Sequence, residues 1–237
     1  MMDNIPYEEW EQYLLQVMEH FGVKPCSKLA ELGCGTGTMS QLLAEDGFRV
    51  TGLDLSQDML DVAAQKSLDA YGDGGQIKYM QADMRDFQLA EKQDVIVSIC
   101  DSVNYLLTEE DLYKTFVSVR KNLKEKGVFI FDLKTEYFYE QVLDGRVYKG
   151  KADGVSYIWN NLYDPEARIH KYHLIFKDKH KQIREELHRQ HVFKAADIVS
   201  AARKAGFVKG AAYDAFTFDK PKKCSERIYI VLRNSDS

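Results

Sequence analysis

The chain has 237 residues, of which 45% are hydrophobic, and a formal net charge of −5. Its length suits one domain with an insertion, and no apolar stretch is long enough to span a bilayer. Its 32 basic residues are outnumbered by 37 acidic ones, which disfavours a nucleic-acid partner. The four cysteines form no CxxC pair and the N-terminus lacks a signal pattern, so we expect a reduced, cytoplasmic protein without a zinc site or membrane anchor.

The first part of the chain, up to about residue 135, alternates apolar strands with amphipathic helices. The run from Asp94 to Cys100 is continuously apolar in its middle, as in a strand buried on both faces. Ser56 and Thr108 are placed to cap helices. The sequence predicts strands at 28–32, 49–53, 77–81, 94–100 and 128–133, helices at 6–20, 38–45, 56–68 and 108–126, and a turn at 73–75. This alternation predicts a parallel sheet with helices on both sides.

The pattern changes beyond residue 137. Segment 146–194 loses helical periodicity, is rich in aromatic residues, and is interrupted by turn signals at 153–154, 164–165 and 177–181. We expect three or four antiparallel strands there. A helix at 195–205 and two strands at 208–216 and 227–232 complete the chain. The sequence therefore predicts an α/β domain formed by residues 1–137 and 195–237, and an antiparallel β insertion at 138–194.

A glycine-rich loop, Gly33-Cys34-Gly35-Thr36-Gly37, joins the first predicted strand to a helix. Glycines let the backbone turn tightly and approach a ligand beside the free N–H groups of a helix N-terminus. The spacing departs from a dinucleotide fingerprint, because Thr38 stands where the third glycine belongs. A P-loop is excluded as well, because no Gly-Lys-Ser/Thr follows.

Carboxylates follow successive predicted strands. Asp54, Asp83 and Asp101 each end a strand, and Glu31 precedes the glycine loop. Ligands of open α/β sheets bind at the carboxyl ends of the strands. We therefore expect a nucleoside-type ligand there, with Asp54 accepting from ribose hydroxyls and Asp83 from an adenine amino group.

Four segments together carry a family resemblance. They are the loop motif at 29–37, the strand and helix start at 50–60, the segment 81–85, and the run 94–106. With them the chain resembles the class I S-adenosylmethionine-dependent methyltransferases, of the small-molecule type with an antiparallel β insertion. The resemblance implies a Rossmann-like, seven-stranded, mainly parallel sheet, S-adenosyl-L-methionine as the cofactor, and a transferase whose insertion covers the acceptor site.

The resemblance also implies roles for individual residues. The loop would hold the methionine part of the cofactor, and Cys100 and Asp101 would lie near the sulfonium. Tyr7 and Tyr13 are the candidates for an N-terminal tyrosine that closes over the cofactor. The implied cofactor-binding residues are Glu31, Gly33, Cys34, Gly35, Gly37, Asp54, Leu55, Met59, Asp83, Met84 and Cys100.

A sulfonium methyl group is already electrophilic, so the protein mainly has to align the acceptor's lone pair behind it. No catalytic triad is therefore expected. A base is required only where the acceptor must first lose a proton. Asp101 and His188 are the candidate catalytic residues, with a tyrosine of the insertion as an alternative. Five of the six histidines fall in the insertion, but histidines three residues apart in a strand face opposite ways, which argues against a metal site.

An aromatic group and the acceptor class remain open at this point. Tyr157, Trp159 and Tyr163 share one strand face, where Tyr172 can join them, either as the core of the insertion or as a cage for the acceptor. The leading hypothesis is methyl transfer to nitrogen or oxygen of a small molecule. An RNA or protein methyltransferase and a non-catalytic cofactor-binding protein are the alternatives. A homodimer is compatible with the sequence.

Overall fold

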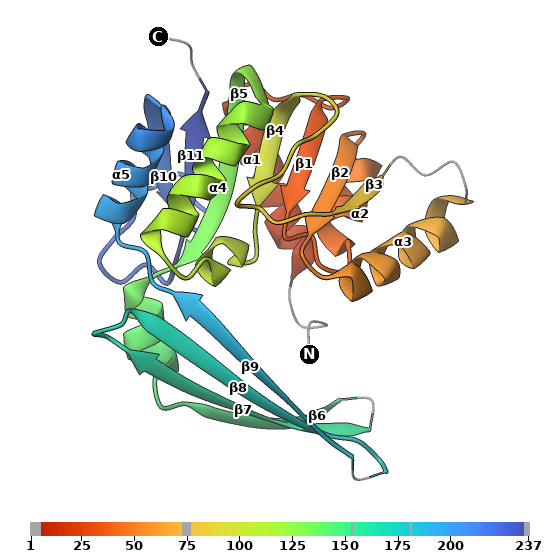
Figure 1. The fold of residues 1–237 in the computed structure, drawn as a ribbon, viewed down its shortest axis with the longest axis vertical. Coiled ribbons are helices and arrows are strands. Elements are labelled where there is room, and N and C mark those ends of the chain that lie inside the picture. The colour runs from red at the N-terminus through yellow and green to blue at the C-terminus, as the bar shows by residue number, and fades with distance from the viewer. Residues whose placement is uncertain (1–5, 73–76, 153, 181, 235–237) are drawn as a thin grey trace.

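The computed structural model describes residues 6–72, 77–152, 154–180 and 182–234 (Figure 1). The main sheet contains seven strands: β1 Lys28–Leu32, β2 Arg49–Asp54, β3 Lys78–Gln81, β4 Gln93–Ser98, β5 Leu123–Lys134, β10 Lys209–Asp214 and β11 Arg227–Arg233. Their order is β10-β11-β5-β4-β1-β2-β3. β11 runs antiparallel to both of its neighbours and the other pairs are parallel. The predicted fold class is confirmed.

Helices cover both faces of this sheet (Figure 1). They are α1 Tyr7–His20, α2 Thr38–Glu45, α3 Gln57–Tyr71, α4 Glu109–Asn122 and α5 Ala195–Ala205, with short turns η2 Ser102–Tyr105 and η3 Phe138–Leu143. The two faces are visible in β4, where Val95 and Val97 pack with α1 and α2 while Ile96 packs with α4 and α5. Burial on both sides explains the continuous apolar run in the sequence.

A second sheet lies between β5 and α5 in the chain. Its strands are β6 Val147–Ala152, β7 Val155–Asp164, β8 Ile169–Lys177 and β9 Ile183–His191. They pair antiparallel in chain order. Figure 1 shows this sheet extending away from the main sheet, attached where β9 leads into α5. The structure thus has four strands where the sequence predicted three or four.

Two predicted features differ from the structure or fall outside it. The turn at 73–75 lies outside the described residues. The helix expected to reach residue 126 ends at Asn122, because β5 already begins at Leu123. The following residues bond to Asn234, whose carbonyl accepts from Lys126 N at 2.6 Å. These sheet-edge contacts replace the last helical turn.

The two predicted helix caps are present. Ser56 Oγ accepts from Met59 N, and Thr108 Oγ1 accepts from Asp111 N at 3.0 Å. Each cap satisfies an amide that the helix leaves free. Within the described part of the chain, no helix is long and apolar enough to cross a membrane.

Candidate active site

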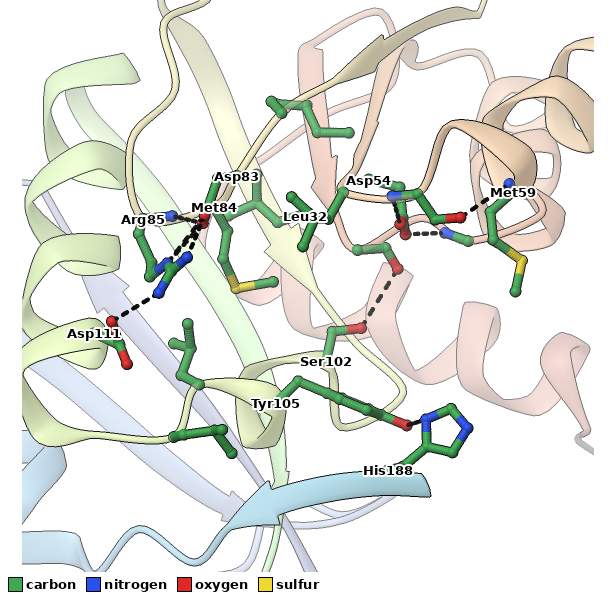
Figure 2. Close-up of a pocket in the computed structure, with 18 residues that line it drawn as sticks. Leu32, Asp54, Met59, Asp83, Met84, Arg85, Ser102, Tyr105, Asp111 and His188 are labelled. Carbon is green, nitrogen blue, oxygen red and sulfur yellow. Dashed lines mark hydrogen bonds and ion pairs between the residues drawn. The ribbon is translucent and has the colours of Figure 1, made fainter. Parts of the chain in front are cut away.

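A cavity of about 670 Å³ opens at the carboxyl edge of β1 and β2 (Figure 2). The loop after β3, the η2 turn and strand β9 complete its wall. It is lined by Leu32, Gly33, Gly35, Leu53, Asp54, Leu55, Ser56, Met59, Ala82, Asp83, Met84, Arg85, Ser102, Tyr105, Leu106, Leu107, Asp111 and His188. One cavity therefore joins the expected cofactor residues to the second sheet through His188.

The glycine loop has a conformation that only glycine adopts easily. The φ angles of Gly33, Gly35 and Gly37 are +72°, +53° and +75°. A Cβ on Gly33 would lie 2.8 Å from Ser102 Cβ, so the loop packs tightly against η2. A Cβ on Gly35 would meet nothing within 4 Å. The backbone at Gly35 is thus open to a ligand in the cavity.

Asp54 is fixed at the end of β2 by backbone amides. Its carboxylate accepts from Gly35 N at 2.8 Å and from Ser56 N at 2.9 Å. A carboxylate has about four acceptor positions, so two remain for a ligand. Leu55 and Met59 are 66% and 46% exposed beside it, which leaves apolar surface free in the cavity.

Asp83 differs from the expectation of a free acceptor. Arg85 binds its carboxylate, with Nη2 2.6 Å from Oδ2, and also lies 3.1 Å from Asp111. Hydrogen bonding from Arg85 lowers the pKa of Asp83 although burial opposes this. Asp83 therefore stays ionised and shares its oxygens with Arg85, while Met84 lines the same wall of the cavity.

Several residues implied as cofactor contacts do not line the cavity. Glu31 is buried behind the loop, where Ser40 Oγ donates to it. Gly37 is enclosed by Tyr79, whose ring would meet a Cβ there. Cys34 and Cys100 are also outside the lining, and burial raises the pKa of both thiols above the ordinary range. Their contact with the cofactor stays a prediction, and the cavity reaches the loop through Gly33 and Gly35.

The two N-terminal tyrosines have different environments. Tyr13 is buried in the core and donates to Thr217 O at 2.5 Å. Burial raises the pKa of Tyr7 to about 12, with the nearby Cys100 and Glu31 adding to the shift. Tyr7 is therefore the tyrosine near the glycine loop.

Asp101, the first candidate base, is buried and fully bonded. Its oxygens lie 2.9 Å from Arg227 and 3.1 Å from Lys134, and Gln190 Nε2 donates at 2.7 Å. Burial alone would raise the pKa of Asp101, but the two cations hold it below the ordinary value. Asp101 does not line the cavity. A stabilised, enclosed carboxylate accepts protons poorly, which disfavours Asp101 as the base.

His188, the second candidate base, does face the cavity. Its Nδ1 lies 3.5 Å from Tyr105 Oη (Figure 2). Its Nε2 lies 3.2 Å from Glu186 Oε2. Burial raises the pKa of Tyr105 to about 12, and the charges of Asp101 and Glu186 add to the shift. Tyr105 is therefore a neutral phenol near neutral pH. Side-chain contacts of this kind often tighten once a substrate binds.

Tyr105 and Glu186 were not singled out from the sequence. Tyr105 is separated from His188 by 83 residues, so no local pattern connects them. Glu186 had a usable signal, because residues two apart in a strand share a face with His188.

The remaining histidines and rings of the insertion are mostly structural. His170 is buried and bonded to Asn161 at 3.2 Å, and burial lowers its pKa to about 4. Tyr163 and Tyr172 are buried in a small core that includes Tyr139. Among the described residues, no group of three metal-binding side chains occurs.

A family model for the methyltransferase domain matches residues 29–127. The chain is 31% identical to YqeM of Bacillus subtilis (strain 168), whose name places it among the methyltransferases, over 99% of this chain and 93% of that protein. It is also 31% identical to the dTDP-3-amino-3,4,6-trideoxy-alpha-D-glucopyranose N,N-dimethyltransferase of Streptomyces venezuelae, over 76% of this chain and 75% of the relative.

A solved structure agrees with these matches. The S-adenosylmethionine-dependent methyltransferase from Clostridium acetobutylicum ATCC 824 has a TM-score of 0.87 and 26% identity, over 98% of this chain and 94% of that one. The sheet, the glycine loop and the cavity define an α/β enzyme with a nucleoside-type site. The chain belongs to the class I S-adenosylmethionine-dependent methyltransferases, so S-adenosylmethionine is its methyl donor.

Proposed function

We propose that this methyltransferase acts on the nitrogen of a small-molecule amine. The observation that carries the proposal is the single cavity that runs from Asp54 to His188. Its volume of about 670 Å³ is in the range of small-molecule sites. The sugar N,N-dimethyltransferase of Streptomyces venezuelae, by its name, also methylates nitrogen. We further propose that residues 1–137 and 195–237 hold the cofactor and that 138–194 cover the acceptor.

The residues at one end of the cavity fit S-adenosylmethionine. The open backbone at Gly35, the free acceptor positions of Asp54 and the exposed Leu55 and Met59 suit a nucleoside with a charged tail. When bound, the cofactor supplies an electrophilic methyl group on sulfur. We infer that Gly33, Gly35 and Asp54 orient it, and that Glu31, bonded to Ser40, supports the loop.

We infer that His188 accepts the proton that an ammonium acceptor must lose. An amine that is protonated in water has no lone pair to offer, so a nearby base raises the fraction that can react. Tyr105 can pass the proton to Nδ1 of His188, and Glu186 at Nε2 would stabilise the imidazolium ion. Leu106 and Leu107, which follow Tyr105 in the chain, add apolar lining to the cavity.

The first experiment compares two histidine–glutamate pairs. His188 pairs with Glu186, and His173 lies 2.9 Å from Glu185 on the opposite face of the same sheet. The wild type and each variant are incubated with S-adenosylmethionine and a panel of small amines and alcohols, and formation of S-adenosylhomocysteine is measured. We expect turnover of an amine, a roughly 10²–10⁴-fold lower kcat in His188→Gln, and wild-type kcat in His173→Gln.

The outcome separates binding from catalysis. Calorimetry with S-adenosylhomocysteine should give the same Kd for both histidine variants and the wild type, whereas Asp54→Ala should bind at least tenfold more weakly, about 1.4 kcal/mol. Turnover of alcohols alone, or equal rates in the two histidine variants, would contradict the proposal. A homodimer and a cytoplasmic location remain predictions, which sedimentation and cell fractionation test.

A further inference from the structure

The second sheet has an inner and an outer face that the strand register defines. Tyr172 lies opposite His188 across β8 and β9, so both side chains point to the same face. That face meets the main domain, because Tyr172 accepts from Lys134 at 3.2 Å and Gln190 donates to Asp101. We call it the inner face, and the opposite one the outer face.

Aromatic side chains continue outward from His188 along the inner face. Four paired residues, one from each strand, form a row across this face: Tyr148, Trp159, Leu174 and Glu186, in the order β6 to β9. The Tyr148 and Trp159 ring centroids are 5.4 Å apart, and those of Trp159 and Tyr172 are 5.7 Å apart. Tyr148 is 41% exposed and Trp159 beside it is half-buried, so these two rings are accessible to a ligand, whereas Tyr172 is buried.

In the next row, two residues further along the strands, a tyrosine ring lies close to the backbone of a glycine. Gly150 in β6 lies opposite Tyr157, with Phe176 and Arg184 beyond it. A Cβ on Gly150 would lie 2.5 Å from Tyr157 Cζ, so the tyrosine ring lies across the glycine instead of standing above the sheet. A glycine inside a strand weakens it, and commonly marks such a close approach. Five apolar side chains from these two rows form a surface that we call the aromatic platform: Tyr148, Tyr157, Trp159, Leu174 and Phe176.

The charges of the second sheet are segregated between its faces. Within strands β6–β9 as described, the register puts a single Lys or Arg, Arg184, on the inner face. The outer face carries the others, which are Lys149, Lys151, Lys171, Lys177 and Arg189. Glu186 adds a negative charge beside the platform, and the cation that lines the adjoining cavity, Arg85, is already paired with Asp83 and Asp111. A diphosphate group is normally held by several cations or a glycine loop.

We propose that the platform binds the body of the acceptor, and that the acceptor is a flat, apolar amine rather than a nucleotide-linked sugar. This inference rests on the proposed N-methyl transfer. Aromatic rings provide stacking surface for a planar body and attract a cationic amine through their faces. The amine nitrogen would then point to His188 and Tyr105, at the end of the platform nearest the cavity. The proposal therefore separates this chain from its amino-sugar relative by acceptor class.

The test uses two probes of opposite chemistry. Protein saturated with S-adenosylhomocysteine is titrated by calorimetry with 2-(1-naphthyl)ethylamine and, separately, with thymidine diphosphate. We expect the naphthyl amine to bind and thymidine diphosphate to bind at least about tenfold more weakly. Tyr148→Ala and Trp159→Ala should each weaken binding of the naphthyl amine about five- to tenfold. Tyr148 is exposed, so its variant is expected to fold.

Leu162→Ala is the matched control. Leu162 lies on the outer face of β7 and is 58% exposed, so its loss should leave the naphthyl amine affinity unchanged. Tighter binding of thymidine diphosphate than of the amine, no amine binding at all, or equal losses in Leu162→Ala and Tyr148→Ala would each overturn the proposal. Failure to bind S-adenosylhomocysteine is a separate result: it removes the proposed function, and the platform's role with it.

Discussion

Glu31 is a carboxyl group enclosed beneath the glycine loop, with an exposure of 3%. Burial raises its pKa from 4.5 to about 7, although the hydrogen bond from Ser40 opposes the shift. The folded chain therefore keeps a proton that the unfolded chain loses above pH 4.5. The free energy of unfolding must fall as pH rises from 4.5 to about 7, and the loss amounts to about 3 kcal/mol above that window.

Glu31→Gln should remove this dependence, because glutamine keeps the acceptor for Ser40 and has no proton to lose. We expect the variant and wild type to have similar urea midpoints at pH 5, and the variant to be the more stable by about 2–3 kcal/mol at pH 8. Glu9→Gln, an exposed site on α1, is the control and should leave the difference between the two pH values unchanged. Parallel pH profiles for wild type and Glu31→Gln would contradict the assignment.

At the scale of elements, η2 is held by a residue next to Tyr105. Asn104 is fully buried; its Nδ2 donates to His191 O at 2.9 Å and its Oδ1 accepts from Lys134 N at 3.0 Å. It thus joins η2 to the ends of β9 and β5. The same contacts set the separation between Tyr105 on η2 and His188 on β9.

Asn104→Ala leaves a buried amide and a buried carbonyl without partners. We expect a loss of about 2–4 kcal/mol in the free energy of unfolding, measured by urea denaturation. Methyl transfer should decrease more than affinity for S-adenosylhomocysteine, because η2 carries Tyr105. Asn160→Ala is the control: Asn160 donates to His173 O at 3.5 Å in a more open position, and its loss should cost under about 0.5 kcal/mol. Equal effects would show that Asn104 does not join the elements.

Helices and strands could be predicted from the sequence where the pattern that indicates them involves neighbouring residues. The apolar run of β4, the caps at Ser56 and Thr108, and the alternation within β6–β9 depend on neighbours in sequence. Asp54 was predictable too, because parallel strands share one carboxyl edge. The early end of α4 was not, because it depends on Asn234 at the far end of the chain.

The candidate site was predictable only in part, for the same reason. Sequence spacing locates Glu31 beside the glycine loop, but only the packed structure shows that it is buried beneath the loop and bonded to Ser40. The enclosure of Asp101 could not be predicted either, since its partners Arg227 and Lys134 come from distant strands. The pair of Tyr105 and His188 likewise exists only after the second sheet has docked on η2.

A buried charge network connects the main sheet to the second sheet. Arg227 on β11 binds both Asp101 and Asp132, and Lys134 binds Asp101. Gln190 extends the network to the second sheet by donating to Asp101 at 2.7 Å while it accepts from Tyr139 and Tyr172. The network pairs two carboxylates with two cations, so the loss of one cation would leave a buried carboxylate without its partner. Because the pKa of Asp101 is lowered, its contribution is present above the unfolded-state pKa and is lost as pH falls towards the folded-state value.

Arg227→Met tests how much of the molecule depends on this network. The variant would leave Asp101 and Asp132 buried without their shared cation, and it would remove the contact of Arg227 with the Trp10 ring at 4.6 Å. We expect a loss of about 3–5 kcal/mol in the free energy of unfolding. Arg233→Met is the control: Arg233 lies over Phe21 at 5.8 Å and donates to Phe21 O at 2.7 Å, and within the described part of the chain it binds no buried carboxylate. Its loss should cost under about 1 kcal/mol. Urea midpoints for both variants at pH 7 decide the matter: equal shifts would mean that the two sheets are joined by packing, and that the network adds little to stability.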